Sequence, residues 1–170
     1  MAETPQEYRE RIMNLVGQGS ALKLQAAAPK KIEKLVKRVP TAKLRKRPEP
    51  ARWSIAEIVA HLADTELVGG YRIRMILGAP GTAIQAFNQD DWAAALRYDK
   101  QDIRESLTRF RTLREANLAI LKSLRPEQWK LFGIHAERGE ETIETIAKLY
   151  AGHDQNHIQQ IERILARKKK

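Results

Sequence analysis

Apolar residues recur at intervals of three and four along most of this chain, and that spacing constrains the fold more than any other feature. The clearest example lies between residues 141 and 166. One stripe at helical spacing comprises Ile143, Ile146, Tyr150, His157, Ile161 and Ile164. An α-helix turns once in about 3.6 residues, so these side chains share one face. No segment alternates apolar and polar residues convincingly enough to predict a strand. The sequence therefore predicts an all-α protein.

Proline and glycine divide this pattern into four long helical regions. We expect them at residues 5–39, 55–77, 99–125 and 141–166, the first broken into pieces by Gly17, Gly19 and Pro29. Two long connections separate the later helices, and the one at 79–98 is expected to hold a short helix. This arrangement predicts a four-helix bundle, a fold that often builds metal and cofactor sites between facing helices.

The length of 170 residues and the lack of a compositional break predict a single domain over residues 1–170. The chain contains no cysteine, which excludes disulfides, thiolate zinc sites and cysteine nucleophiles. The first residues do not resemble a signal peptide, and no apolar run approaches the roughly 20 residues of a membrane span. We therefore expect a cytoplasmic protein with no membrane partner.

The formal net charge of +10 is concentrated in two places. Residues 29–52 hold ten lysines or arginines against two glutamates, and residues 167–170 are all basic. We interpret these segments as a solvated helix face, a basic loop at about 40–52 and a frayed tail. The alternative is a nucleic-acid-binding module. The basic stretch lacks interleaved aromatic residues and any recognition motif, so nucleic acid is not the expected partner.

Three of the four histidines are candidates for a metal site. His153 and His157 are four residues apart, so their side chains are neighbours on the last helix. Two ligands rarely hold a metal alone, and His61, in the middle of the second helix, is the best third candidate. Three imidazoles would leave coordination positions open, as in catalytic sites. The alternative is that each is a hydrogen-bonded core histidine. His135 is expected in a loop, outside this set.

Three other side chains are candidates to assist this site. Glu57 precedes His61 by one turn, although its spacing from Ser54 also fits a capping box. Asp64 could orient an imidazole, or form a surface salt bridge. Gln160, three residues after His157, could line the pocket or bond to backbone.

These residues resemble a known family. The pattern W-S-I-x-E-I-x-x-H-L-x-D-x-E from Trp53 to Glu66, followed by H-x-x-x-H-x-x-Q-I from His153 to Ile161, is similar to the DinB/YfiT-like superfamily. The intervening segments F-N-Q-D-D-W and H-x-E-R-G are similar to the same group. The resemblance covers nearly the whole chain, and its two halves occur in the right order.

The resemblance implies an up-down-down-up four-helix bundle that is often a homodimer. It also implies a divalent metal, zinc or nickel, held by His61, His153 and His157. Characterised relatives include bacillithiol S-transferases and a mycothiol-dependent maleylpyruvate isomerase, and others are described only as metal-dependent hydrolases. A bound metal can activate either a thiol or water.

Because the chain has no cysteine, a thiol would have to be a small-molecule cosubstrate of the bacillithiol, mycothiol or glutathione type. We expect a metal-dependent thiol transferase acting on an electrophile, with a hydrolase and a non-enzymatic metal-binding protein as alternatives. Four arginines on the second and third helices could bind the carboxylates of such a thiol, although arginines at such positions are usually solvated. They are Arg72, Arg74, Arg109 and Arg114.

Overall fold

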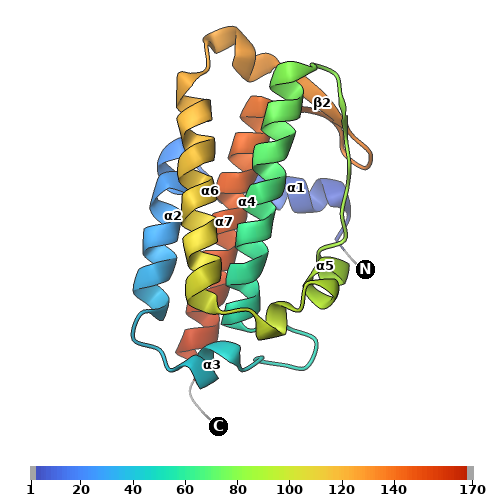
Figure 1. Ribbon diagram of the computed structural model, residues 1–170. Coiled ribbons are helices and arrows are strands. Elements are labelled where there is room, and N and C mark those ends of the chain that lie inside the picture. Colours follow the sequence, from blue (N-terminus) through green and yellow to red (C-terminus); the bar gives the residue numbers. More distant parts are fainter. Residues whose placement is uncertain (1–2, 168–170) are drawn as a thin grey trace.

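Four long helices form a bundle in the computed structural model, which describes residues 3–167. They are α2 (Ala21–Val36), α4 (Ile55–Gly78), α6 (Ile103–Ser123) and α7 (Ile143–Ala166). α2 and α7 run in one direction, and α4 and α6 in the other (Figure 1). The predicted up-down-down-up topology is therefore confirmed. The basic tail beyond Arg167 lies outside the described residues. None of the helices within residues 3–167 combines the length and the apolar character that crossing a membrane requires.

The parallel arrangement of α4 and α6 depends on the long connection between them. From the end of α4 the chain passes through β1 (Ala83–Ile84), α5 (Gln89–Ala95) and the 3₁₀ turn η1 (Tyr98–Lys100). This segment returns along the outside of the bundle to the end where α4 began (Figure 1). A side-chain cap at Asp102 then starts α6 at Ile103, four residues later than the sequence pattern predicts.

Pro29 does not interrupt its helix, contrary to our expectation. α2 continues through it from Ala21 to Val36. Proline lacks the N–H that would bond to the carbonyl four residues earlier, which here belongs to Gln25. The guanidinium of Arg114 on α6 donates to that carbonyl oxygen over 2.9 Å. A neighbouring helix therefore replaces the donor that proline lacks.

Two short helices lie outside the four long ones in the N-terminal third of the chain. They are α1 (Pro5–Asn14) and α3 (Thr41–Arg45). α1 has the capping box of Thr4 and Glu7. α3 occupies part of the segment that the sequence predicts to be a basic loop.

A small sheet, which the sequence pattern does not predict, lies at the end of the bundle where α7 begins. β2 (Phe132–His135) pairs antiparallel with β3 (Gly139–Thr142) and parallel with β1. The 3₁₀ turn η2 (Pro126–Lys130) precedes it. These strands have two to four residues, too few for an alternating pattern to show. His135 is accordingly in a strand and not in a loop.

Polar side chains occupy the middle of the bundle, between two apolar clusters. One cluster lies where α3 meets the long helices and includes Ile58, Leu62, Phe110, Ile158 and Ile161. The other lies near the sheet and includes Ile73, Ile76, Leu121, Ile143 and Ile146. Glu66, Arg114, His153 and His157 belong to the helix segments between them, and His61 is next to Leu62 of the first cluster.

Candidate metal centre

The three candidate histidines converge. His153 Nε2 lies 3.1 Å from His61 Nε2 and 3.1 Å from His157 Nε2. One ring nitrogen from each residue can be chosen so that all three lie within 4.8 Å of one another. α4 contributes His61, and one face of α7 contributes the other two. Tertiary packing thus brings together residues that are 92 positions apart in sequence.

Burial keeps these imidazoles neutral. His61 is 2% exposed and His157 is 7% exposed. Burial lowers the pKa of His157 to about 4, and burial together with the neighbouring imidazoles lowers the pKa values of His61 and His153 well below the ordinary value. A neutral imidazole has a free lone pair, and metal binding requires that form. Nitrogens 3.1 Å apart can also share one ion at the usual metal–nitrogen distance of about 2.0–2.1 Å. The donor set fits a divalent transition metal.

Gln160 contacts the cluster but does not line the cavity beside it. Its Oε1 lies 2.9 Å from Nδ1 of His157. If that nitrogen carries the proton, it donates to the amide oxygen and the lone pair of Nε2 points toward the other two imidazoles. The indole ring of Trp53 packs against His61, with ring centroids 4.8 Å apart. These two contacts restrict the orientations of the rings.

The two carboxylates predicted to assist the site contact other partners. Glu57 completes the capping box with Ser54 and pairs with Arg47. Asp64 accepts a hydrogen bond of 2.6 Å from the hydroxyl of Tyr98. Neither carboxylate is hydrogen-bonded to an imidazole among residues 3–167. His135 is also separate: its Nδ1 accepts from the backbone N–H of Glu137 over 3.1 Å.

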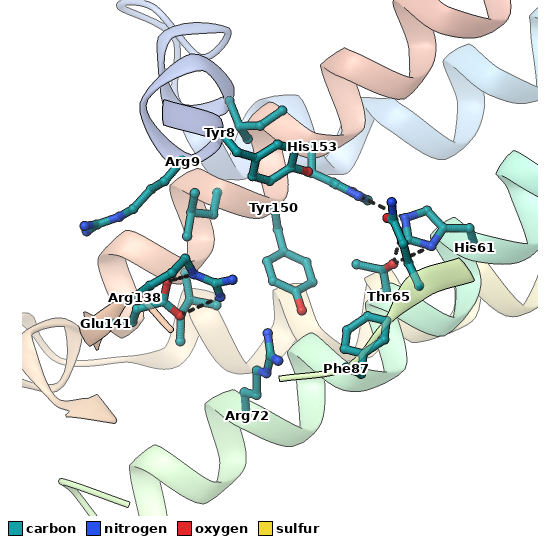
Figure 2. Close-up of a pocket in the computed structure, with 14 residues that line it drawn as sticks. Tyr8, Arg9, His61, Thr65, Arg72, Phe87, Arg138, Glu141, Tyr150 and His153 are labelled. Carbon is teal, nitrogen blue, oxygen red and sulfur yellow. Dashed lines mark hydrogen bonds and ion pairs between the residues drawn. The ribbon is translucent and has the colours of Figure 1, made fainter. Parts of the chain in front are cut away.

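A cavity of about 290 Å³ lies beside the histidines, and His61 and His153 form part of its wall. Its other walls come from α1, α4, α7, the segment before α5 and the β2–β3 hairpin (Figure 2). Arg9, Arg72, Arg138 and Glu141 supply charges, and Phe87 and Tyr150 supply aromatic rings. The volume is at the small end of the roughly 300–1,000 Å³ range of ligand pockets. The cavity therefore suits a small molecule that can reach the histidines.

Two glycines allow the close packing that shapes this cavity. A Cβ at Gly69 of α4 would lie 2.3 Å from the ring of Tyr150, so glycine is needed for that ring to lie against α4. A Cβ at Gly152 of α7 would lie 2.0 Å from the carbonyl oxygen of Ile12. Gly152 thus lets α1 lie across α7 and place Tyr8 at the cavity wall.

A buried ionic cluster, which sequence reasoning missed, lies close to the histidines. Arg114 on α6 pairs with Glu66 on α4 and Asp154 on α7, and all three side chains are at most 3% exposed. Asn117 also donates to Glu66, over 2.8 Å. Burial alone would lower the pKa of Arg114, but the charges of Asp154 and Glu66 outweigh it and raise that pKa. The sequence did contain a signal for this cluster, because Glu66, Arg114 and Asp154 are charged residues in the middle of three predicted helices.

The four arginines that could bind a carboxylate differ in their partners. Arg114 is held in the ionic cluster, Arg74 donates to Asn117, and Arg109 donates to Gln101. Arg72 lies at the cavity wall.

Comparisons with known proteins identify relatives of this chain that share its fold. The sequence model of the DinB superfamily matches residues 26–161. A protein of Halalkalibacterium halodurans named "Putative metal-dependent hydrolase" is 26% identical over 69% of this chain and 68% of its own length. "Putative metal-dependent hydrolase YfiT" of Bacillus subtilis is 27% identical over 68% of this chain and 65% of its own length.

A solved structure of YfiT from Bacillus subtilis superposes with a TM-score of 0.80 at 20% identity. The match covers 96% of this chain and 88% of that one. YfiT is described there as a probable metal-dependent hydrolase with an unusual four-helix bundle topology. At this identity the likeness establishes the fold.

Proposed function

This chain belongs to the DinB superfamily, and on that premise we propose that it is a divalent-metal-dependent hydrolase of a small molecule, with His61, His153 and His157 as the metal ligands. The observation that carries the proposal is the convergence of three neutral imidazole nitrogens beside a cavity. The names of the relatives support hydrolysis. We propose zinc or nickel as the metal, because imidazole nitrogen suits both ions.

When bound, the metal would supply Lewis-acid chemistry that lowers the pKa of a coordinated water or thiol. The protein's own residues hold and shield the site. Gln160 fixes the orientation of His157, and Trp53 packs against His61. α1 covers one side of the cavity, which limits access of bulk water to the histidines.

Thiol transfer is the second candidate, and the placement of the carboxylates favours it. A hydrolase usually has a general base close to the nucleophile. Glu141, the carboxylate in the cavity wall, is paired with Arg138, with N···O 2.7 Å. Coordination alone deprotonates a thiol, so a low-molecular-weight thiol of the bacillithiol, mycothiol or glutathione type would need no such base. The substrate would then be a small electrophile. The homodimer implied by the family resemblance stays a prediction.

Metal analysis of untagged protein tests the ligands. We expect about one equivalent of zinc or nickel in the wild type, and at least about 100-fold weaker binding in the His153→Ala variant, since ligand loss exceeds the effect of losing an outer partner. His135→Ala is the matched control, because it removes a buried imidazole that lies outside the cluster. Metal retained by His153→Ala at wild-type affinity would contradict the proposed ligand set.

Activity assays of the metal-loaded protein separate the two reactions. One arm offers small esters and amides, and the other offers glutathione or bacillithiol with a small electrophile such as monobromobimane. Hydrolysis that is lost in His153→Ala supports the first candidate. Thiol conjugation that is lost in the same variant supports the second candidate. If the wild type also leaves the esters and amides intact, hydrolysis is excluded as the main reaction.

A further inference from the structure

Arg72 is a buried cation that no carboxylate of residues 3–167 neutralises. It is 8% exposed and lies in the wall of the cavity that His61 and His153 share. Its guanidinium donates one hydrogen bond, of 2.6 Å, to the carbonyl oxygen of Gln85. Among residues 3–167 it forms no ion pair. A buried charge is costly unless it is paired, so this guanidinium calls for an anion from outside the chain.

The hydroxyl of Tyr150 lies next to Arg72 in the same cavity. Figure 2 shows Tyr150 from α7 and Arg72 from α4 pointing toward each other, with the cavity between them and His153. Within residues 3–167 the hydroxyl has no hydrogen-bond partner. Burial raises the pKa of Tyr150 to about 12, although Arg72 acts in the opposite direction, so the hydroxyl keeps its proton near neutral pH. It can therefore donate to an anion held by Arg72.

The rest of the wall limits which anion fits. Glu141 lies on the same cavity and already neutralises Arg138. Arg138 is therefore not free to act as a second cation for a doubly charged phosphate. A single guanidinium presents a planar fork that matches the two oxygens of a carboxylate. The guanidinium carbon of Arg72 lies over the ring of Phe87, 5.9 Å from the ring centroid. This contact helps to hold the guanidinium in place.

We propose that Arg72 and Tyr150 form a subsite for a carboxylate group of the substrate. The subsite rests on the proposed function in one respect, because the substrate would place its reacting group at the histidines and its carboxylate at Arg72. The subsite narrows the substrate class to an organic acid, or to a cosubstrate that carries a free carboxylate. Either molecule must be short enough to fit a cavity of about 290 Å³.

Binding of propionate, followed by NMR on ¹⁵N-labelled protein as purified, tests this subsite. The probes are propionate, the uncharged propionamide and inorganic phosphate. We expect propionate to shift the side-chain N–H signal of Arg72 and to bind more tightly than either other probe. Arg72→Gln should weaken propionate binding about tenfold or more, because a charge-assisted hydrogen bond is lost. Arg111→Gln makes the same charge change at an exposed position and should alter binding by less than about twofold.

Wild-type affinity for propionate in Arg72→Gln would overturn the proposal, and so would equal binding of propionamide. Tighter binding of phosphate would overturn the carboxylate assignment. If Arg72→Gln fails to fold, Arg72→Lys keeps the charge without the planar fork, and Tyr150→Phe removes only the hydroxyl. Both should bind propionate less tightly than the wild type. Unchanged affinity in both variants would overturn the subsite.

The metal proposal and the subsite proposal can fail separately. The same titration is repeated after chelator treatment, with the dispersion of the NMR signals reporting that the protein stays folded. Binding that shifts Arg72 with or without metal supports the subsite even if His153→Ala keeps its metal. Propionate could instead bind only when the metal is present and leave the Arg72 signal unshifted. That result would show that the carboxylate binds the metal, and it would overturn the subsite.

Discussion

Two buried polar clusters share helices α4 and α7, and they differ in whether their charged or metal-binding groups have partners within the protein. In the ionic cluster of Glu66, Arg114 and Asp154, each charge has an opposite charge from another helix. In the histidine cluster, three ring nitrogens face one another, and none of these imidazoles forms an ion pair with a described residue. Adjacent residues of α7, His153 and Asp154, belong to different clusters. The cluster with internal partners holds the helices together, whereas the cluster without them is suited to bind a ligand.

The largest expected effect comes from removing the cation of the ionic cluster. Arg114→Met leaves two buried carboxylates without a counterion and the Gln25 carbonyl without a donor. Breaking a buried ion pair in this way costs roughly 3–5 kcal/mol. We expect a loss of that size in the free energy of unfolding, measured by urea denaturation at pH 7.

The control for this variant is Arg111→Met, which removes an exposed arginine of the same helix and should change stability by less than about 0.5 kcal/mol. The triple variant Glu66→Gln, Arg114→Met, Asp154→Asn leaves no unpaired charge and should be more stable than the single variant. Equal stability of Arg114→Met and the wild type would show that this cluster does not hold the helices.

An intermediate effect is expected from the outer contact of the histidine cluster. Gln160→Leu removes the acceptor for Nδ1 of His157. Loss of such a partner typically weakens metal binding about 10–100-fold. Competition with a chromophoric chelator measures this affinity. Gln159→Leu, at an exposed neighbouring position, is the control. Gln160→Glu should retain tight binding, since a carboxylate accepts the same proton. Unchanged affinity in Gln160→Leu would separate Gln160 from the site.

The smallest effect concerns pH. The pKa values of the three histidines are lowered in the fold, to about 4 for His157, so protons compete with a metal only in acid. A lowered pKa means that the neutral, metal-binding form persists as the pH falls below the ordinary value of 6.5. We expect metal affinity to change by less than about threefold between pH 7.5 and pH 6.5 and to fall steeply below about pH 5. A tenfold loss already between pH 7.5 and pH 6.5 would contradict burial of a neutral cluster.

Much of the fold could be predicted because it depends on local signals. The apolar stripe of α7 and the capping box of Ser54 and Glu57 are contained within short segments. The order of the four long helices followed from these segments and from the family resemblance. Helical spacing also placed His153 and His157 on one face. The strands were missed because they have only two to four residues, and the continuation through Pro29 was missed because it depends on a donor from another helix.

The sequence alone therefore determined which residues are helical and which of them share a face, because periodicity and capping act over a few residues. Tertiary structure decided which face meets which. It directed Asp64 to Tyr98, Arg114 to two carboxylates, and Arg72 to a cavity wall where no carboxylate of residues 3–167 pairs with it. These residues look alike in the sequence, since each is a charged side chain in a helical pattern. Their roles differ because the neutralising partner comes from another helix, and the packing of the helices sets whether that partner exists.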